Sequence, residues 1–233
     1  MTTRYLLSGL LLAILSLRGV GDPPKPAEAK KTALNKNNTL FLEVLPNGSK
    51  RVLIEAVVCQ RDVPLELLMC PKPSKEHEAI LNAEVNVELI HAALVACGAK
   101  PGKVVQYQPK VLPPSGTTIK ITLRYEKKPG EVVTVDAKEW VRNVKTGKAL
   151  DVDWVFAGSQ FFQDPDEKDK KPYYMANGGD AITVSNFTDA MLDLPIDSSK
   201  NNAELSFECF TERIPEKGTK VTMILEPVLE KKK

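Results

Sequence analysis

The chain has 233 residues, 42% of them hydrophobic and 27% charged, and its 32 basic and 30 acidic residues give a formal net charge of +2. Arg4 and Arg18 are the only charged residues among the first 21, so the remaining chain is formally neutral (30 − 30 = 0). Because a neutral chain has no electrostatic reason to bind nucleic acid or an anionic membrane surface, we expect neither partner.

The first 21 residues have the pattern of a signal peptide. Arg4 precedes an apolar run over 5–17, which is too short to span a bilayer comfortably, and Gly19 and Gly21 are small residues of the kind that a signal peptidase reads. We expect cleavage near Gly21. The mature chain is then exported to the periplasm or the cell exterior and has no integral membrane segment.

The composition divides the rest of the chain into three parts. Residues 22–38 are rich in Pro, Ala, Lys and Asn and predict a flexible linker. Residues 39–228 have a globular pattern and the size of one domain with a sizeable core. Residues 229–233 form a charged tail.

Strand patterns dominate this domain. Apolar runs and period-two alternation predict strands at 40–45, 52–59, 65–70, 78–85, 118–125, 132–137, 154–161, 181–184, 205–210 and 220–226. The first two are separated by Pro46–Gly48, and 118–125 and 132–137 by Pro129 and Gly130, so each pair is expected to form a hairpin.

The clearest helix pattern covers 87–97. Asn86 is a good N-cap, and Gly98 and Pro101 end the pattern. A short helix is also expected at 187–192, after Asn186. Helices do not alternate regularly with strands. The sequence therefore predicts a single α+β domain with a mixed or mostly antiparallel sheet, one helix at about 87–97 and one or two short helices.

The four cysteines, Cys59, Cys70, Cys97 and Cys209, lack the C-x-x-C spacing of zinc ribbons, thioredoxin-type pairs and iron–sulfur proteins. We therefore expect no cofactor. Cys59 and Cys70 end successive strand patterns, so one interpretation is that they face each other in a disulfide. The alternative, which we favour, is that all four cysteines are small buried apolar residues.

The two histidines, His77 and His91, are the candidates for acid–base chemistry, with Glu78 as a neighbouring carboxylate. They lack the i, i+4 spacing with which a helix binds zinc, so no metal site is expected. They could form a shared catalytic site only if the strand that follows His77 and the helix that carries His91 converge. The favoured alternative is one solvated histidine and one that donates to a backbone carbonyl.

The aromatic side chains Trp140, Trp154 and Phe156 lie between loops that contain Gly and Ser. Aromatic side chains in such a setting can line a carbohydrate or peptide groove, which makes these three the candidate ligand-binding residues. The alternative, which we favour, is that they belong to the core.

Several segments carry a family resemblance when they are taken in order. They read KEHEAIL, IHAALVACGAKPG, EWVRNVKTGKAL, WVFAGS, GGDAITVSNFTDAMLDLP and FECFTERIPEKGT. Together they resemble the YdjY-domain family of exported bacterial proteins, in the variety found in planctomycete-type bacteria, over roughly Val52 to Pro227. The family brings no established activity. Some members are described as ferredoxin-like because of clustered cysteines, and this chain has no such cluster.

These observations favour an exported binding or structural module of the cell envelope, with another envelope protein or a small ligand as its partner. The main alternative is a periplasmic enzyme, a hydrolase or a metal-assisted catalyst, that uses His77, Glu78 or His91. A weaker alternative, which rests on the resemblance alone, is a redox accessory protein.

Overall fold

The computed structural model describes residues 28–166, 168–198 and 205–229. The expected signal peptide at 1–21 and nearly all of the charged tail lie outside these residues. No helix in the described ranges is both long enough and apolar enough to cross a membrane.

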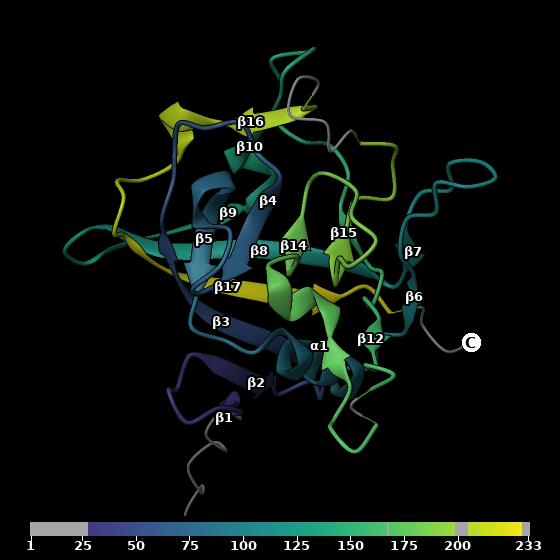
Figure 1. The fold of residues 1–233 in the computed structure, drawn as a ribbon. Coiled ribbons are helices and arrows are strands. Elements are labelled where there is room, and N and C mark those ends of the chain that lie inside the picture. The colour runs from purple at the N-terminus through teal and green to yellow at the C-terminus, as the bar shows by residue number, and fades with distance from the viewer. Residues whose placement is uncertain (1–27, 167, 199–204, 230–233) are drawn as a thin grey trace, which may run out of the picture.

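Within the described residues, eight strands close into a ring because β3, at one end of the row, also pairs with β5 at the other (Figure 1). In spatial order they are β3 (Lys50–Val58), β17 (Lys220–Pro227), β8 (Thr118–Lys128), β11 (Trp154–Phe156), β15 (Leu192–Asp193), β14 (Ile182–Thr183), β4 (Leu67–Pro71) and β5 (Ala79–Ala83). The prediction of a mixed, mostly antiparallel sheet is confirmed, since only the pairs β14–β15 and β4–β5 are parallel among the described strands. The closure into a barrel is not predicted by the sequence pattern.

Three further strands extend the ring at two places. They are β1 (Lys30–Ala33), β2 (Leu40–Val44) and β9 (Glu131–Asp136). The first two continue outward from β3, and β9 forms the expected hairpin with β8. The flexible linker predicted over 22–38 is therefore wrong at β1, where four residues pair with β2 and Lys31 lies 3.2 Å from Glu55.

Smaller two-stranded sheets and short helices decorate the ring. The sheets join β6 (Pro101–Lys103) to β7 (Ser115–Gly116), β10 (Val141–Asn143) to β16 (Phe207–Cys209), and β12 (Phe161–Phe162) to β13 (Tyr173–Tyr174). The described 3-10 helices are η1 (Glu76–Glu78), η2 (Ala137–Trp140), η3 (Met175–Gly178) and η5 (Thr211–Arg213).

The single α-helix of the described ranges, α1 (Val87–Ala96), confirms the strongest helix prediction. The Asn86 side chain accepts the Glu88 N–H at 2.8 Å and caps the first turn. Gly98, which follows the last turn, has φ +93° and provides the left-handed conformation that ends the helix. The buried residues Ile90 and Leu94 of α1 belong to the barrel core.

The short helix predicted at 187–192 is wrong. A turn follows Asn186, and the chain then enters β15 at Leu192. The Asn186 side chain does not cap this segment: its amide Nδ2 donates to Asp193 Oδ1 at 3.0 Å, and its Oδ1 accepts the Ser198 N–H at 2.8 Å. Long-range hydrogen bonds have therefore taken the place of the local cap.

The barrel interior holds a continuous apolar core. Strand β8 shows its origin, since Ile119, Ile121 and Leu123 are buried while the alternate residues Lys120 and Arg124 are exposed. Trp154 belongs to this core and has no exposed surface, and its indole N–H donates to the Thr183 carbonyl at 2.7 Å. Hydrophobic burial of this kind is the main force that stabilises the closed ring.

Two connections between parallel strands are unusually short and lie beside each other. The segment 72–78 joins β4 to β5, and 184–191 joins β14 to β15. Parallel pairs usually need a crossover of a dozen or more residues. Because β14 is the neighbour of β4 in the ring, both connections meet on one side of the barrel, and they carry most of the polar groups described below.

Candidate functional site

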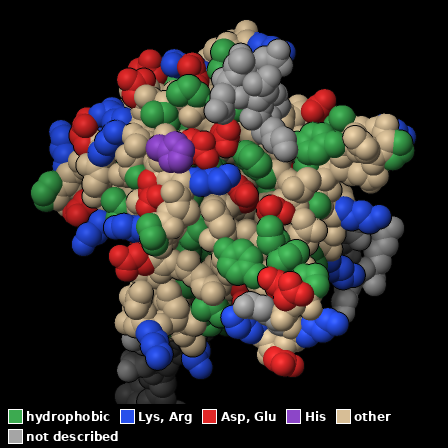
Figure 2. Space-filling view, viewed as in Figure 1, with side chains coloured by type: hydrophobic (Ala, Val, Ile, Leu, Met, Phe, Trp, Pro, Cys, Tyr) green, Lys and Arg blue, Asp and Glu red, His purple; other side chains and the backbone are tan. Residues whose placement is uncertain are grey.

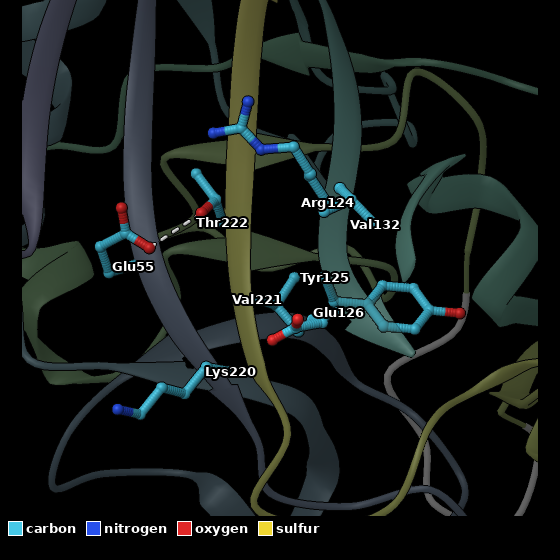
Figure 3. Close-up of a pocket in the computed structure, with 8 residues that line it drawn as sticks. All are labelled: Glu55, Arg124, Tyr125, Glu126, Val132, Lys220, Val221 and Thr222. Carbon is cyan, nitrogen blue, oxygen red and sulfur yellow. Dashed lines mark hydrogen bonds between the residues drawn. The ribbon is translucent and has the colours of Figure 1, made fainter. Parts of the chain in front are cut away.

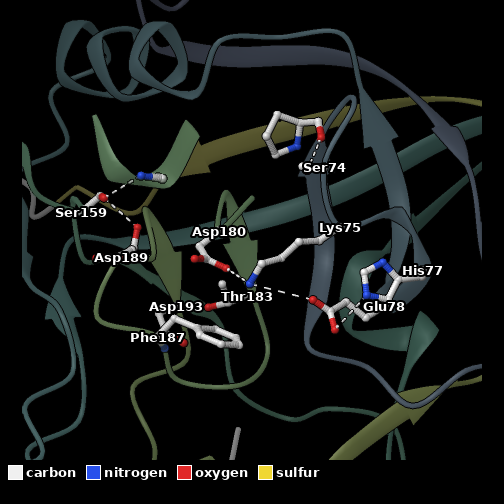
Figure 4. A network of polar contacts seen from close by, with 12 residues as sticks. Ser74, Lys75, His77, Glu78, Ser159, Asp180, Thr183, Phe187, Asp189 and Asp193 are labelled. Atoms are coloured by element: carbon white, nitrogen blue, oxygen red, sulfur yellow. Dashed lines mark hydrogen bonds and ion pairs between the residues drawn. The ribbon is translucent and has the colours of Figure 1, made fainter. Parts of the chain in front are cut away.

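Lys75 lies at the centre of a polar cluster that the first short connection forms (Figure 4). Its ammonium nitrogen is 2.9 Å from Asp180 Oδ1 and 3.9 Å from Glu78 Oε1, and it lies 4.5 Å from the ring centroid of Phe187. The alkyl chain packs against Gly179, where a Cβ would come within 2.8 Å of it. Lys75 therefore joins the two connections in one contact.

Glu66 lies against this cluster from the start of β4. Its backbone N–H donates to the Glu78 carbonyl at 3.2 Å. Glu66 directly precedes β4 and Glu78 directly precedes β5, so the two residues lie side by side at the starts of two parallel strands. Burial, followed by the charge of Glu78 and a hydrogen bond with it, raises the pKa of Glu66 to about 7, against the opposing effect of Lys75. The Glu66–Glu78 pair can therefore hold a proton near neutral pH.

The charge of Lys75 is stabilised in this setting. Burial lowers its pKa, but the hydrogen bond to Asp180 and the charges of Asp180, Glu78 and Glu66 outweigh burial, and the net effect raises it. Lys75 is thus a fixed cation that holds the cluster together, and not a base. The sequence does not predict Lys75, Glu66 and Asp180 as one cluster, because no local spacing connects residues that the barrel topology brings together.

The two histidines lie in different surroundings. The His77 side chain is 77% exposed, and its Nε2 is 3.7 Å from Glu78 Oε2. Figure 2 shows a histidine flanked by acidic and basic side chains on this face. His91 instead contacts the rings of Phe156 and Tyr174, at centroid distances of 4.8 and 5.5 Å.

His91 belongs to a separate hydrogen-bonded cluster. Its Nδ1 is 2.9 Å from the Tyr174 hydroxyl, which donates to the Gly158 carbonyl at 2.9 Å. Since the hydroxyl proton goes to that carbonyl, Nδ1 of His91 is the donor of the other bond. Burial lowers the pKa of His91, so the ring is neutral at pH 7. The structure brings His77 and Glu78 together, but His91 makes its contacts elsewhere.

The candidate ligand-binding aromatics are core residues. Trp140 is 1% exposed, and Trp154 and Phe156 have no exposed surface. The interpretation that they line a groove is therefore wrong, because all three side chains are part of the buried core cluster. The exposed aromatics lie next in the chain, on β12 and β13, where Phe161, Phe162 and Tyr173 are each about half exposed.

All four cysteines are free thiols. The disulfide interpretation for Cys59 and Cys70 is wrong: Cys59 follows β3, Cys70 lies in β4, and β5 lies between these two strands. Two strand spacings amount to roughly 9–10 Å, whereas bridged Cα atoms are usually about 4.4–6.8 Å apart. Burial raises the pKa of Cys59 to about 12 and those of the other three thiols to about 11. Such thiols are poor nucleophiles at neutral pH.

The described residues contain no group of three or more His, Cys, Asp or Glu side chains that could hold a metal ion.

A small cavity of about 190 Å³ lies on the outer face of the barrel (Figure 3). Its charged lining residues are two acids, Glu55 and Glu126, and two bases, Arg124 and Lys220. Glu55 already accepts a hydrogen bond from Thr222 at 2.9 Å, so this face is a balanced polar surface.

A larger groove of about 670 Å³ lies beside the second short connection. The stretch after β6 forms one wall, and residues that follow β11 and β14 form the other. The lining residues are Gly102, Lys103, Val104, Val105, Gln106, Tyr107, Gln108, Ala157, Ser159 and Thr188. Val105 and Ala157 are buried, whereas Lys103, Gln106, Gln108 and Thr188 are exposed, so an apolar floor has a polar rim.

Comparison with known proteins gives a single kind of match. No curated protein and no solved structure matches the chain significantly. The family model of the YdjY domain matches residues 44–226, which is most of the chain and nearly all of the barrel. The match includes both short connections, the Lys75 cluster and the groove. The chain therefore belongs to the YdjY domain family.

Proposed function

We propose that this protein is an exported binding module that holds a small, largely apolar ligand in the groove between the segment after β6 and the Thr188 turn. The volume of about 670 Å³ carries the proposal, because small-molecule sites usually measure about 300–1,000 Å³ and combine apolar walls with a few polar groups. Lys103 is the one formally charged lining residue of this groove, which favours a ligand with an anionic group. Export is inferred from the pattern of the first 21 residues.

The chemistry of the other clusters supports binding over catalysis. The candidate catalytic side chains have protein partners: His77 lies 3.7 Å from Glu78, and His91 is hydrogen-bonded to Tyr174. The Ser159 hydroxyl, which lines the groove, donates to the Asp189 carbonyl at 2.6 Å. None of the residues that line the groove is a histidine or a carboxylate. The groove therefore offers shape and hydrogen bonds, but no acid–base pair.

The test is to block the groove from its rim. Thr188 is exposed, so Thr188→Trp introduces a large side chain at little cost to the core. We expect it to abolish binding of an anionic, apolar fluorescent probe such as anilinonaphthalene sulfonate and of hits from a fragment library. The matched control is Val144→Trp, which changes an exposed valine outside the groove lining. Equal probe binding by both variants would refute the proposal.

The Glu66–Glu78 pair favours a second candidate function, a periplasmic hydrolase that uses this pair with His77. A carboxyl group that titrates near pH 7 beside a second carboxylate is a common acid–base arrangement. The conservative variant Glu78→Gln would abolish any hydrolytic activity found in a substrate panel, while Thr188→Trp would leave that activity unchanged. The opposite pattern would place the chemistry at the groove.

A further inference from the structure

Asp193 is a buried carboxyl group at the end of β15. It has no exposed surface, and burial raises its pKa to about 7 despite several hydrogen bonds. Its Oδ1 accepts the Asn186 amide at 3.0 Å and the Leu194 N–H at 2.8 Å, and its Oδ2 lies 3.4 Å from the Phe187 N–H. Asp193 thus holds the start of the turn that leads to the groove (Figure 4).

The same turn connects the two walls of the groove. The Tyr107 hydroxyl, on the first wall, donates to the Asn186 carbonyl at 2.7 Å. Thr188, on the second wall, follows Asn186 by two residues. Both walls are therefore attached to a residue whose side chain is hydrogen-bonded to Asp193.

The charged and titratable groups around the turn are few. On one side are the Tyr107 phenol and Asp197, and the negative charges of Asp193 and Asp197 contribute, after burial, to a raised pKa of Tyr107. On the other side, Lys75 with Asp180, Glu78 and Glu66 faces Phe187, and the Glu66 carbonyl accepts the Val184 N–H at 2.8 Å. Asp189, within the turn, bonds Gln160 at 2.9 Å. Asp193 is the most deeply buried of these carboxyl groups, and Asn186 connects it to Tyr107 of the groove wall.

We infer that binding of an anionic, largely apolar ligand in the groove is coupled to protonation of Asp193. When Asp193 is protonated, it adds no charge behind the groove. When it ionises, a negative charge in a low-dielectric setting opposes the anionic group, so affinity falls. By thermodynamic linkage, the bound anion in turn favours the protonated form of Asp193. This inference rests on the proposed function and adds its regulation.

The experiment is a binding titration with anilinonaphthalene sulfonate, whose sulfonate stays ionised over the whole range, at several pH values between about 5.5 and 8.5. For the wild type we expect the affinity to fall about three- to tenfold as the pH rises through about 7. Asp193→Asn should remove most of this dependence. The matched control Asp189→Asn, which changes a carboxylate of the same turn, should retain it.

A second measurement requires no substitution. The pKa of the Asp193 carboxyl, followed by carbon-13 NMR, should be higher in the probe complex than in the free protein. A probe that binds in the groove with the same affinity at every pH, or without any effect on that pKa, would overturn the inference and leave the proposed function standing. Failure of the probe to bind at any pH, with no difference between wild type and Thr188→Trp, would refute both.

Discussion

Lys75 shows how a single residue can join distant parts of this chain. It is 105 residues away from Asp180, yet their side chains form the shortest ion pair in which Lys75 takes part, and its cation also lies over Phe187. The side chain is 28% exposed and Asp180 is 11% exposed, so water screens this pair less than it screens surface pairs. Removing the cation would leave Asp180 and Glu78 without their counter-charge.

We expect Lys75→Met to lower the free energy of unfolding by about 2 kcal/mol, because it leaves partly buried carboxylates unpaired while it preserves the volume of the side chain. The measurement is urea unfolding followed by circular dichroism. Lys171→Met is the control, since Lys171 is 71% exposed in its ion pair with Glu88 and should change stability by less than about 0.5 kcal/mol. Equal losses in both variants would contradict the central role of Lys75.

At the scale of elements, a sequence pattern predicts the right structure where the residues that it involves also bond to one another in the fold. The helix α1 is predicted because Asn86, Gly98 and the apolar spacing act within a dozen residues. The segment at 187–192 has a similar Asn at its start, but that Asn bonds Asp193 and Ser198 instead. Its turn conformation depends on residues that local patterns do not include.

The cap of α1 gives a direct test at this scale. We expect Asn86→Ala to cost about 1 kcal/mol of unfolding free energy, because the Glu88 N–H loses its acceptor. Asn86→Asp keeps an acceptor oxygen and should remain within a few tenths of a kcal/mol of the wild type. Thermal and urea unfolding of the three proteins would measure this, and an equal loss for Asp and Ala would show that the side chain contributes by some other means.

The sequence predicts only the part of the candidate site whose residues are neighbours in the chain. His77 and Glu78 are adjacent in sequence, and they are close in the structure. The residues that complete the cluster, Glu66, Lys75 and Asp180, come from separate strands and connections and have no motif in common. The barrel closure was also missed, since the pairing of β3 with β5 leaves no trace in the period of either strand.

For the molecule as a whole, two buried carboxyl groups with raised pKa values predict how stability depends on pH. The pKa values of Glu66 and Asp193 are raised from 4.5 and 3.8 to about 7 in each case. A raised pKa means that the folded state keeps protons that the unfolded state has lost. The stability that these protons provide is complete below about pH 4 and is lost as the pH rises toward about 7.

We therefore expect the free energy of unfolding to fall between about pH 5 and pH 7, by up to about 1.4 kcal/mol per pH unit for each group. Urea unfolding at a series of pH values measures this slope. Glu66→Gln should reduce the slope, because it removes one of the two groups. A wild-type stability that stays constant or rises over this interval would contradict the predicted protonation states.

The strand β17 has a further consequence for how the chain reaches its folded state. It lies between β3 and β8 and pairs with both, although its residues 220–227 come more than 160 positions after those of β3. Until these residues arrive, β3 and β8 each expose an unpaired edge, and no ring exists. Assembly must therefore await nearly the whole domain, and contacts of such long sequence separation make folding slow. Until β17 is added, the chain is an open set of hairpins whose order of assembly is fixed by its last long strand.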